Sequence, residues 1–220
     1  MRLFASIRKY MFIFRAIIFA YYTRYKLLHT RYYKQKNIQT QKSIVYINTS
    51  NTQGGAARIA YDLHMFQLSL SNQSQMLVSN KQGTEAEIYE LKQDASKKQQ
   101  LLYEAQKWLQ WQDFFHLASL QLYKHPAIQQ ASIVHAHNLH SWNGFFSPFA
   151  LPELCSRKQV IWTLHDMHAV TGHCAHSFEC IKWKTGCGKC PQLDIYPKLT
   201  KDTTSFIWKT KKRIYKKCDM

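Results

Sequence analysis

The stretch SIVYINTSNTQGG at residues 43–55 sets the fold class, because it joins a strand pattern to a helix pattern through a glycine turn. Its first half is rich in β-branched and aromatic residues and predicts a buried strand over 43–48. Polar residues and two glycines then predict a turn over 49–55. After the turn, apolar residues recur at helical spacing: Ile59, Leu63, Phe66 and Leu70. A strand followed by a helix is the start of a βαβ unit.

Three more strand patterns follow, at residues 75–79, 132–137 and 159–164. Between them, residues 96–124 form one long helical pattern that stops at Pro126. Strands that alternate with helices predict a parallel sheet with helices on both faces and right-handed crossovers. We therefore expect an α/β protein built from a single Rossmann-like domain.

The chain of 220 residues is long enough for one well-buried domain with terminal extensions. Its content of hydrophobic residues, 45%, excludes a wholly disordered protein. The net charge of +17 is concentrated at the two ends. We expect a basic helical extension at 1–42, the Rossmann-like domain at 43–208 and a basic segment at 209–220.

Eleven Lys or Arg residues precede the first acidic residue, Asp62, and ten of them lie in the N-terminal extension. Its apolar run, residues 11–22, is interrupted by Arg15 and is shorter than the roughly 20 residues of a spanning helix. This pattern predicts an amphipathic helix on an anionic membrane, with the protein peripheral on the cytoplasmic face of the plasma membrane. A signal anchor or a solvated extension remains an alternative. Nucleic acid is disfavoured as a partner, because no zinc-finger, RNP or helix-turn-helix pattern is present.

Gly54 and Gly55 lie between the first strand and its helix. Glycines at this point let the backbone approach a ligand, and the free amides of a helix start favour an anion or a hydroxyl-rich group. The sequence here matches neither the dinucleotide-binding G-x-G-x-x-G pattern nor a P-loop. A plain strand-to-helix turn is the alternative interpretation.

Polar residues end the two later strands. Alternation places His135 and His137 on one face of the sheet, where packed and hydrogen-bonded histidines are common. Asn138 and His140 follow the strand end, where a cleft opens, and we expect them to bind a polar ligand.

His165 and Asp166 end the fourth predicted strand and so belong to the same sheet edge. An imidazole there hydrogen-bonds a sugar hydroxyl or a phosphate, and the neighbouring carboxylate fixes its tautomer.

Four cysteines follow in a C-x5-C-x6-C-x2-C spacing: Cys174, Cys180, Cys187 and Cys190. The last pair resembles a zinc knuckle, and four thiolates would complete a tetrahedral structural zinc site. Disulfides or free thiols are the alternatives. A catalytic cysteine is disfavoured, because glycines and lysines surround these residues without a clear base.

These motifs together resemble the N-terminal domain of the family 4 retaining glycosyltransferases, which have the two-domain GT-B fold. The resemblance covers roughly residues 43–215 and is closest to the branch that makes exopolysaccharides such as colanic acid. His168 departs from the family pattern, which has Trp there. The matching segments are GGAARIA at 54–60, IVHAHNLH at 133–140, WTLHDM at 162–167, TGHC at 171–174 and GCGKCP at 186–191.

The resemblance implies transfer of a sugar from a nucleotide-sugar donor, as co-substrate, to a saccharide or polyprenyl-linked acceptor. It implies that His165 contacts the transferred sugar, with Asp166 as the second catalytic residue. It also implies substrate binding by residues after the first and third predicted strands: Gly54, Gly55, Asn138 and His140.

The family's second domain, with its paired glutamates in an E-x7-E motif, has no counterpart in these residues. We therefore expect one half of a split or truncated transferase, with 209–220 as a shortened interdomain helix and a separate donor-binding domain as partner. This leaves open whether the isolated chain is an enzyme. The alternatives are a non-catalytic, membrane-associated saccharide-binding or partner protein, and a zinc-stabilised nucleic-acid binder.

Overall fold

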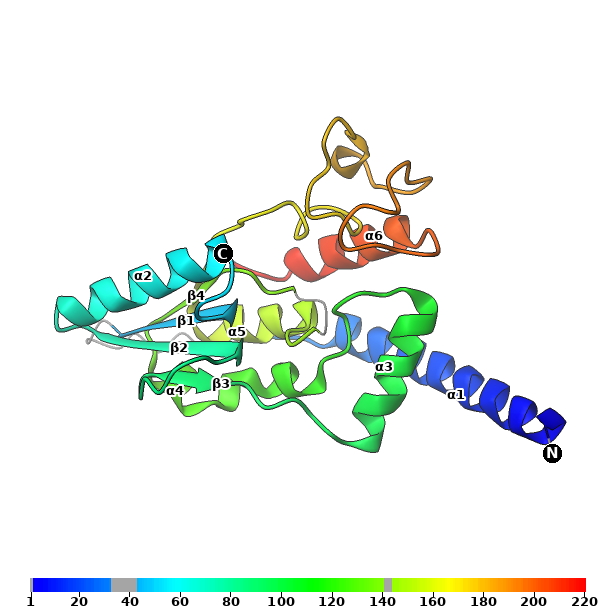
Figure 1. Ribbon diagram of the computed structural model, residues 1–220, viewed down its shortest axis with the longest axis horizontal. Helices are drawn as coiled ribbons and strands as arrows, with labels where there is room; N and C mark the ends of the chain where they lie inside the picture. Colours follow the sequence, from blue (N-terminus) through cyan, green and yellow to red (C-terminus); the bar gives the residue numbers. More distant parts are fainter. Residues whose placement is uncertain (1, 33–42, 141–143) are drawn as a thin grey trace.

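A computed structural model describes residues 2–32, 43–140 and 144–220, with the side chains from residue 10 onward, and shows one parallel sheet (Figure 1). Residues 33–42 of the predicted extension lie outside the described residues. Every neighbouring pair of strands in the sheet is parallel, in the order β3-β2-β1-β4-β5. The strands are β1 Ser43–Ser50, β2 Gln73–Asn80, β3 Ile88–Glu90, β4 Ile133–Ala136 and β5 Gln159–Trp162. The predicted α/β, Rossmann-like fold is confirmed.

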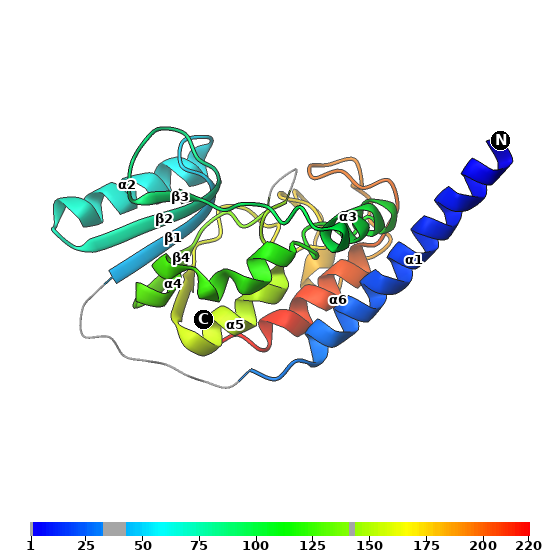
Figure 2. The same ribbon diagram turned by 90° about the horizontal axis from the view of Figure 1, so that it is seen from below.

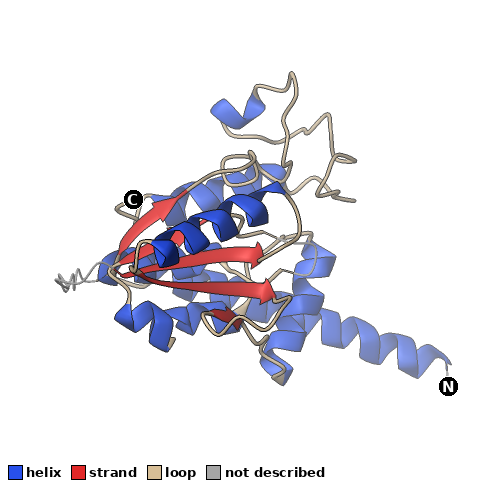
Figure 3. Ribbon diagram, turned by 60° about the vertical axis from the view of Figure 1, so that its left-hand side comes forward, coloured by secondary structure: helices blue, strands red, loops and turns tan. Residues whose placement is uncertain are grey.

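Alternate residues of the central strands point to opposite faces of the sheet, and each face has its own core. Tyr46 and Met76 pack with Ala60 of α2, Gly55–Ser69, on one face. Val45 and Ile47 pack on the other face against residues of α4, Pro126–Gln130, and α5, Leu151–Arg157. Figure 3 shows the strands between these helices. Continuous apolar runs in the central strands are what a sheet buried on both faces requires.

Two parts of the chain differ from the sequence pattern. The edge strand β3 was not predicted, because three residues with one buried side chain, Ile88, give no periodic signal. The predicted helix over 96–124 is also wrong in its extent: α3 covers Lys97–Leu109 and ends at Gln110, which adopts a left-handed conformation with φ of 55°. A separate 3-10 helix, η1, follows at Leu117–Lys124. The break lets Trp111, Phe114 and Phe115 turn into the core.

A second, helical core lies beside the sheet, where α3 meets α1, Arg2–His29, and α6, Thr204–Tyr215. Ala16 and Ala20 of α1 are fully buried there, because small side chains allow close helix packing. The Arg24 side chain donates a hydrogen bond to Thr210 of α6 over 3.1 Å. Figure 2 shows α1 running alongside α6, with its N-terminal part extending beyond the rest of the chain. Across the described parts of the chain, no helix has the length and apolar character needed to cross a bilayer.

The strands β2 and β3 lie on one side of β1, and the chain then crosses to form β4 and β5 on the other side. The strand order therefore reverses between β1 and β4. In parallel sheets of this kind, ligands bind outside the carboxyl ends of the strands at such a switch point. The loops after β1, β4 and β5 meet at this edge. The domain limit predicted at residue 208 falls inside α6.

Candidate functional site

The loops after β1 and β4 are held together by side-chain hydrogen bonds. The backbone N–H of Asn138 donates to the Asn48 side chain over 2.9 Å, and the Thr49 hydroxyl lies 3.0 Å from the carbonyl of Asn138 and 3.2 Å from that of His140. The Asn138 side-chain oxygen accepts the N–H of His140. Asn138 therefore shapes the loop that carries His140, in addition to its predicted role in ligand binding.

A row of three histidines crosses from β4 to the end of β5. The rings of His135 and His137 are 4.3 Å apart, as their spacing on one face of β4 predicts. The ring of His165 stacks on that of His137 at 5.1 Å, and the two share a hydrogen bond of 2.9 Å between Nδ1 of His137 and Nε2 of His165. His135 bonds the Thr163 hydroxyl at 2.8 Å. The buried His137 therefore holds the ring of the exposed His165 in its orientation.

Burial keeps the inner two rings uncharged. Burial, together with the neighbouring His135 and His165, lowers the pKa of His137 to about 3. Burial and the nearby His165 also lower the pKa of His135. A neutral ring has one donor and one acceptor nitrogen, so His137 can share a single hydrogen bond with Nε2 of His165.

The next pair of candidate site residues is His140 and Asp166. Nε2 of His140 lies 2.6 Å from Oδ2 of Asp166, and Oδ1 of Asp166 accepts the backbone N–H of His168 at 2.8 Å. Burial alone would raise the pKa of Asp166, but the hydrogen bond and charge interaction with His140 outweigh it and bring this pKa below its ordinary value. Asp166 is therefore a carboxylate with a protein partner at each oxygen.

Below this pair lie three buried residues that the sequence analysis did not assign to the site: Asp113, His168 and Lys211. His168 stacks on His140 at 4.0 Å, and its Nε2 lies 3.8 Å from Oδ2 of Asp113. Nζ of Lys211 donates to the carbonyl of His168 over 2.6 Å. Burial raises the pKa of Asp113 to about 6 and lowers that of Lys211 to about 8, while their opposite charges oppose both shifts. Together these three residues form a buried polar cluster, which lies beneath the loop that contains Asp166 and supports it.

The sequence contained a pattern that indicates burial of Lys211 but none that indicates burial of Asp113. The buried residues of α6 follow helical spacing at Thr204, Ile207, Lys211 and Ile214, so Lys211 is on the core side of an otherwise basic helix. Asp113 lies in the irregular segment after α3, with φ of 61°, where no periodicity applies.

Four predicted site residues line one small cavity: Asn138, His140, His165 and Asp166. Its volume is about 30 Å³, near that of a single water molecule. His165 lies at its exposed rim. Gly54 and Gly55 do not line it; they are exposed at the start of α2, with open space where a side chain would be. Gly54 has φ of 89°, a conformation that favours glycine, and no side chain caps this helix start.

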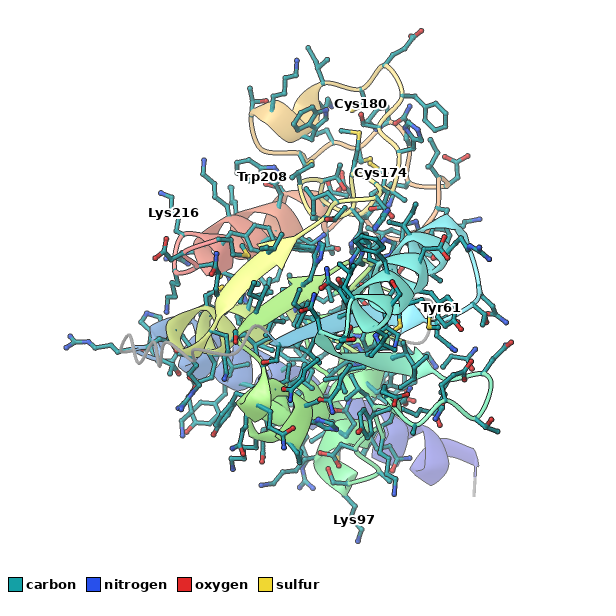
Figure 4. The ribbon with its side chains drawn as sticks, turned by 90° about the vertical axis from the view of Figure 1, so that its left-hand side faces the viewer. Tyr61, Lys97, Cys174, Cys180, Trp208 and Lys216 are labelled. Atoms are coloured by element: carbon teal, nitrogen blue, oxygen red, sulfur yellow. The ribbon has the colours of Figure 1, made fainter. Side chains whose placement is uncertain are left out.

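The four predicted zinc ligands line a separate cavity of about 20 Å³: Cys174, Cys180, Cys187 and Cys190. Cys174 and Cys180 project from the same loop, at the opposite end of the molecule from Lys97 (Figure 4). None of the four is in a disulfide. Burial raises the pKa of Cys187 to about 11 and also raises those of Cys174 and Cys190.

The structure does not support the predicted zinc ion. Within the described part of the chain, no group of three or more His, Cys, Asp or Glu side chains is arranged to hold a metal. Backbone hydrogen bonds order the loop instead, among them the N–H of Cys190 to Asp202 at 2.7 Å and that of Gly188 to Thr204 at 2.9 Å.

Comparison with known proteins gives one partial match. Over 89 residues the chain is 36% identical to a protein described as the putative colanic acid biosynthesis glycosyl transferase WcaC of Escherichia coli strain K12. The match covers 38% of this chain and 22% of that protein. No family model matches the chain. No solved structure matches it significantly. The similarity is thus to a glycosyltransferase of polysaccharide biosynthesis, over a limited segment.

Proposed function

We propose that the chain takes part in transfer of a sugar from a nucleotide-sugar donor to a saccharide or lipid-linked acceptor, and that it supplies the acceptor side of the site. One observation carries this proposal: the loops after β4 and β5 bring four polar residues to the switch point of a Rossmann-like sheet. The partial similarity to a glycosyltransferase supports the same reaction class.

His165 is the residue that we place against the sugar. Its Nε2 is held by His137, so Nδ1 of this exposed ring is the atom left for a ligand hydroxyl. The catalytic role predicted for Asp166 stays a prediction; in the structure each of its oxygens has one protein partner, His140 or the N–H of His168. We assign it as a positioning residue that sets the orientation of the loop between β5 and the cysteines.

Gly54 and Gly55 add an anion-binding element to the same edge. The start of α2 has amides without a side-chain cap, and a helix N-terminus with free amides attracts phosphate. We propose that these amides face the donor phosphates, which a second, donor-binding domain holds from the other side.

We propose that this domain packs at the edge of the sheet beside His165. Ile161 and Leu164 flank the site and are 43% and 48% exposed, although such residues at the end of a parallel strand are usually covered. A second domain seated here covers them and closes the cleft. We further propose that the protein works at an anionic membrane surface, where polyprenyl-linked acceptors reside, with α1 as the contact.

The test is sugar incorporation by membranes of the source cell in which the native copy is replaced by variants. Radiolabelled nucleotide sugars of the uridine- and guanosine-diphosphate classes serve as donors, and label in the lipid-linked fraction is counted. We expect His165→Ala to lower incorporation about tenfold to a hundredfold, the effect of one lost substrate hydrogen bond. The exposed histidine in the cysteine loop gives the matched control, His176→Ala, which is expected to retain incorporation.

Equal incorporation by the His165 variant and the control refutes the assignment of the site. The hydrogen bonds that hold Asp166 to His140 and to the N–H of His168 also fit a second function, saccharide binding without catalysis. In that case removal of the whole chain leaves sugar transfer unchanged, whereas the purified chain still binds the lipid-linked saccharide.

A further inference from the structure

A groove of about 1020 Å³ lies on the side of the molecule away from the sheet. We call it the α1 groove; its walls are α1, the end of α3, the loop at 182–189 and the start of α6. These segments are up to about 190 residues apart in sequence, yet Figure 2 shows α1, α3 and α6 together at one end of the domain.

The floor of the α1 groove is aromatic and rigid. Trp111 stacks on Phe206 with ring centres 4.2 Å apart, and Tyr21 meets Trp111 edge-on at 4.9 Å. Trp108 lies at the rim and is 48% exposed. Tryptophan and tyrosine in such a half-exposed position are typical of the interface between lipid and water.

The rim carries lysines: Lys182, Lys189, Lys201 and Lys209. Nζ of Lys201 lies 3.9 Å from the ring centre of Trp108, which places a cation directly over the aromatic surface. All four lysines are exposed. Cations beside aromatic rings form a suitable site for a phosphate at a lipid surface.

The acidic residue among the groove-lining residues, Asp202, does not neutralise these lysines by pairing with them. Its Oδ2 accepts the N–H of Cys190 at 2.7 Å, and its Oδ1 accepts the N–H and the hydroxyl of Thr204 at 3.1 and 2.7 Å. The carboxylate therefore holds the loop to α6, and the groove keeps an excess of positive charge.

An exposed apolar stripe on α1 continues from the groove. Ala16 and Ala20 face the helical core, whereas the opposite side of α1 exposes a stripe at helical spacing: Met11, Phe14, Ile18, Tyr21, Tyr22 and Tyr25. Tyr21 belongs to both the stripe and the groove. Exposed basic residues, Arg15 and Lys26, border the stripe.

We infer that the α1 groove and the adjoining α1 stripe form one docking surface for the phosphate headgroups of anionic phospholipids in a bilayer. The stripe enters the acyl boundary, Trp108 lies at the level of the headgroups, and Lys189, Lys201 and Lys209 hold lipid phosphates. This inference deepens the proposed membrane location and rests on it. The charge complementarity of groove and lipid selects this partner, since a zwitterionic surface has no net negative charge to attract the lysines.

The test is co-sedimentation of the full chain with vesicles of phosphatidylcholine alone or with about one-third phosphatidylglycerol. One variant carries Lys189→Gln, Lys201→Gln and Lys209→Gln together. The control removes the same charge at exposed lysines remote from the groove, through Lys97→Gln, Lys98→Gln and Lys124→Gln. We expect the groove variant to weaken binding to the anionic vesicles at least tenfold and the control less than threefold, because each basic residue at a lipid surface contributes about fivefold.

A Trp108→Phe variant provides a second readout. Tryptophan fluorescence of the native chain is expected to shift to shorter wavelength on anionic vesicles, and the shift is expected to shrink in the Trp108 variant. Equal losses in the groove and control variants, equal binding to neutral vesicles, or no vesicle binding at all overturns the inference. Vesicle binding requires neither sugar nor donor, so its failure is distinct from a failure of the sugar-transfer experiment.

Discussion

Replacement of Lys211 by methionine tests the buried polar cluster of Asp113, His168 and Lys211. Lys211 is 3% exposed, and its Nζ donates to the carbonyls of His168 and Thr171 at 2.6 and 3.4 Å. Each hydrogen bond from a charged donor contributes about 1.5–3 kcal/mol, and loss of one member of a buried charge pair costs about 3–5 kcal/mol. Methionine fills the space of the side chain but removes the nearby positive charge that opposes the burial-induced rise in the pKa of Asp113. We expect Lys211→Met to lower the free energy of unfolding by about 3–5 kcal/mol at pH 7.

The assay is urea unfolding followed by tryptophan fluorescence. The neighbouring exposed lysine provides the control, and Lys212→Met is expected to change the free energy of unfolding by less than about 0.5 kcal/mol. Adding Asp113→Asn to Lys211→Met removes the unpaired carboxylate and is expected to restore about 1–3 kcal/mol. A loss below about 1 kcal/mol in the single variant, or a double variant less stable than the single one, refutes the coupling of these two residues.

Four further predictions concern pH, metal and thiol reactivity. Because the pKa of Asp113 is raised from 3.8 to about 6 in the folded chain, its contribution to stability is present below pH 4 and is lost as pH rises through 6. Asp113→Asn should remove this pH dependence from urea unfolding, and an unchanged profile contradicts the shift. Burial lowers the pKa of His137 to about 3, so its imidazole should stay neutral down to about pH 4 in an NMR titration; protonation above pH 5.5 would show that the ring is solvated. A chelator should leave the melting temperature of the chain unchanged. The Cys187 thiol, with its pKa raised to about 11, should react slowly with maleimide at pH 7. A chelator-induced fall of several degrees would restore the zinc hypothesis.

The strand-turn-helix pattern around Gly54 was enough to predict the sheet, because continuous apolar runs and turn glycines are local properties of the sequence. The grouping of His140 with Asp166 was also predictable, since carboxyl ends of parallel strands meet at one edge. The short strand β3 is defined by its backbone pairing with β2 and has no periodic sequence pattern of its own, so it was not predicted. The packing of α1 was also missed, because a helix that is apolar on both sides does not reveal which side is buried.

The buried polar cluster beneath the site was the part that the sequence predicted least well. Asp113 and His168 come together from segments 55 residues apart, and neither follows a motif that indicates burial. Lys211 lies within a run of exposed cations, and only the spacing of its apolar neighbours distinguishes it. Such contacts depend on the tertiary fold and not on local sequence.

Binding of the acceptor at the crevice is most directly measured by histidine NMR of the chain. The probe is the lipid-linked saccharide fraction extracted from the source cell, added in detergent, with the same detergent alone as the blank. We predict that the imidazole resonance of His165 shifts on titration, while those of His64 and His176, which do not line the cavity at the ends of β4 and β5, do not. No shift at His165, or shifts confined to the other two histidines, contradicts the placement of the acceptor at the ends of β4 and β5.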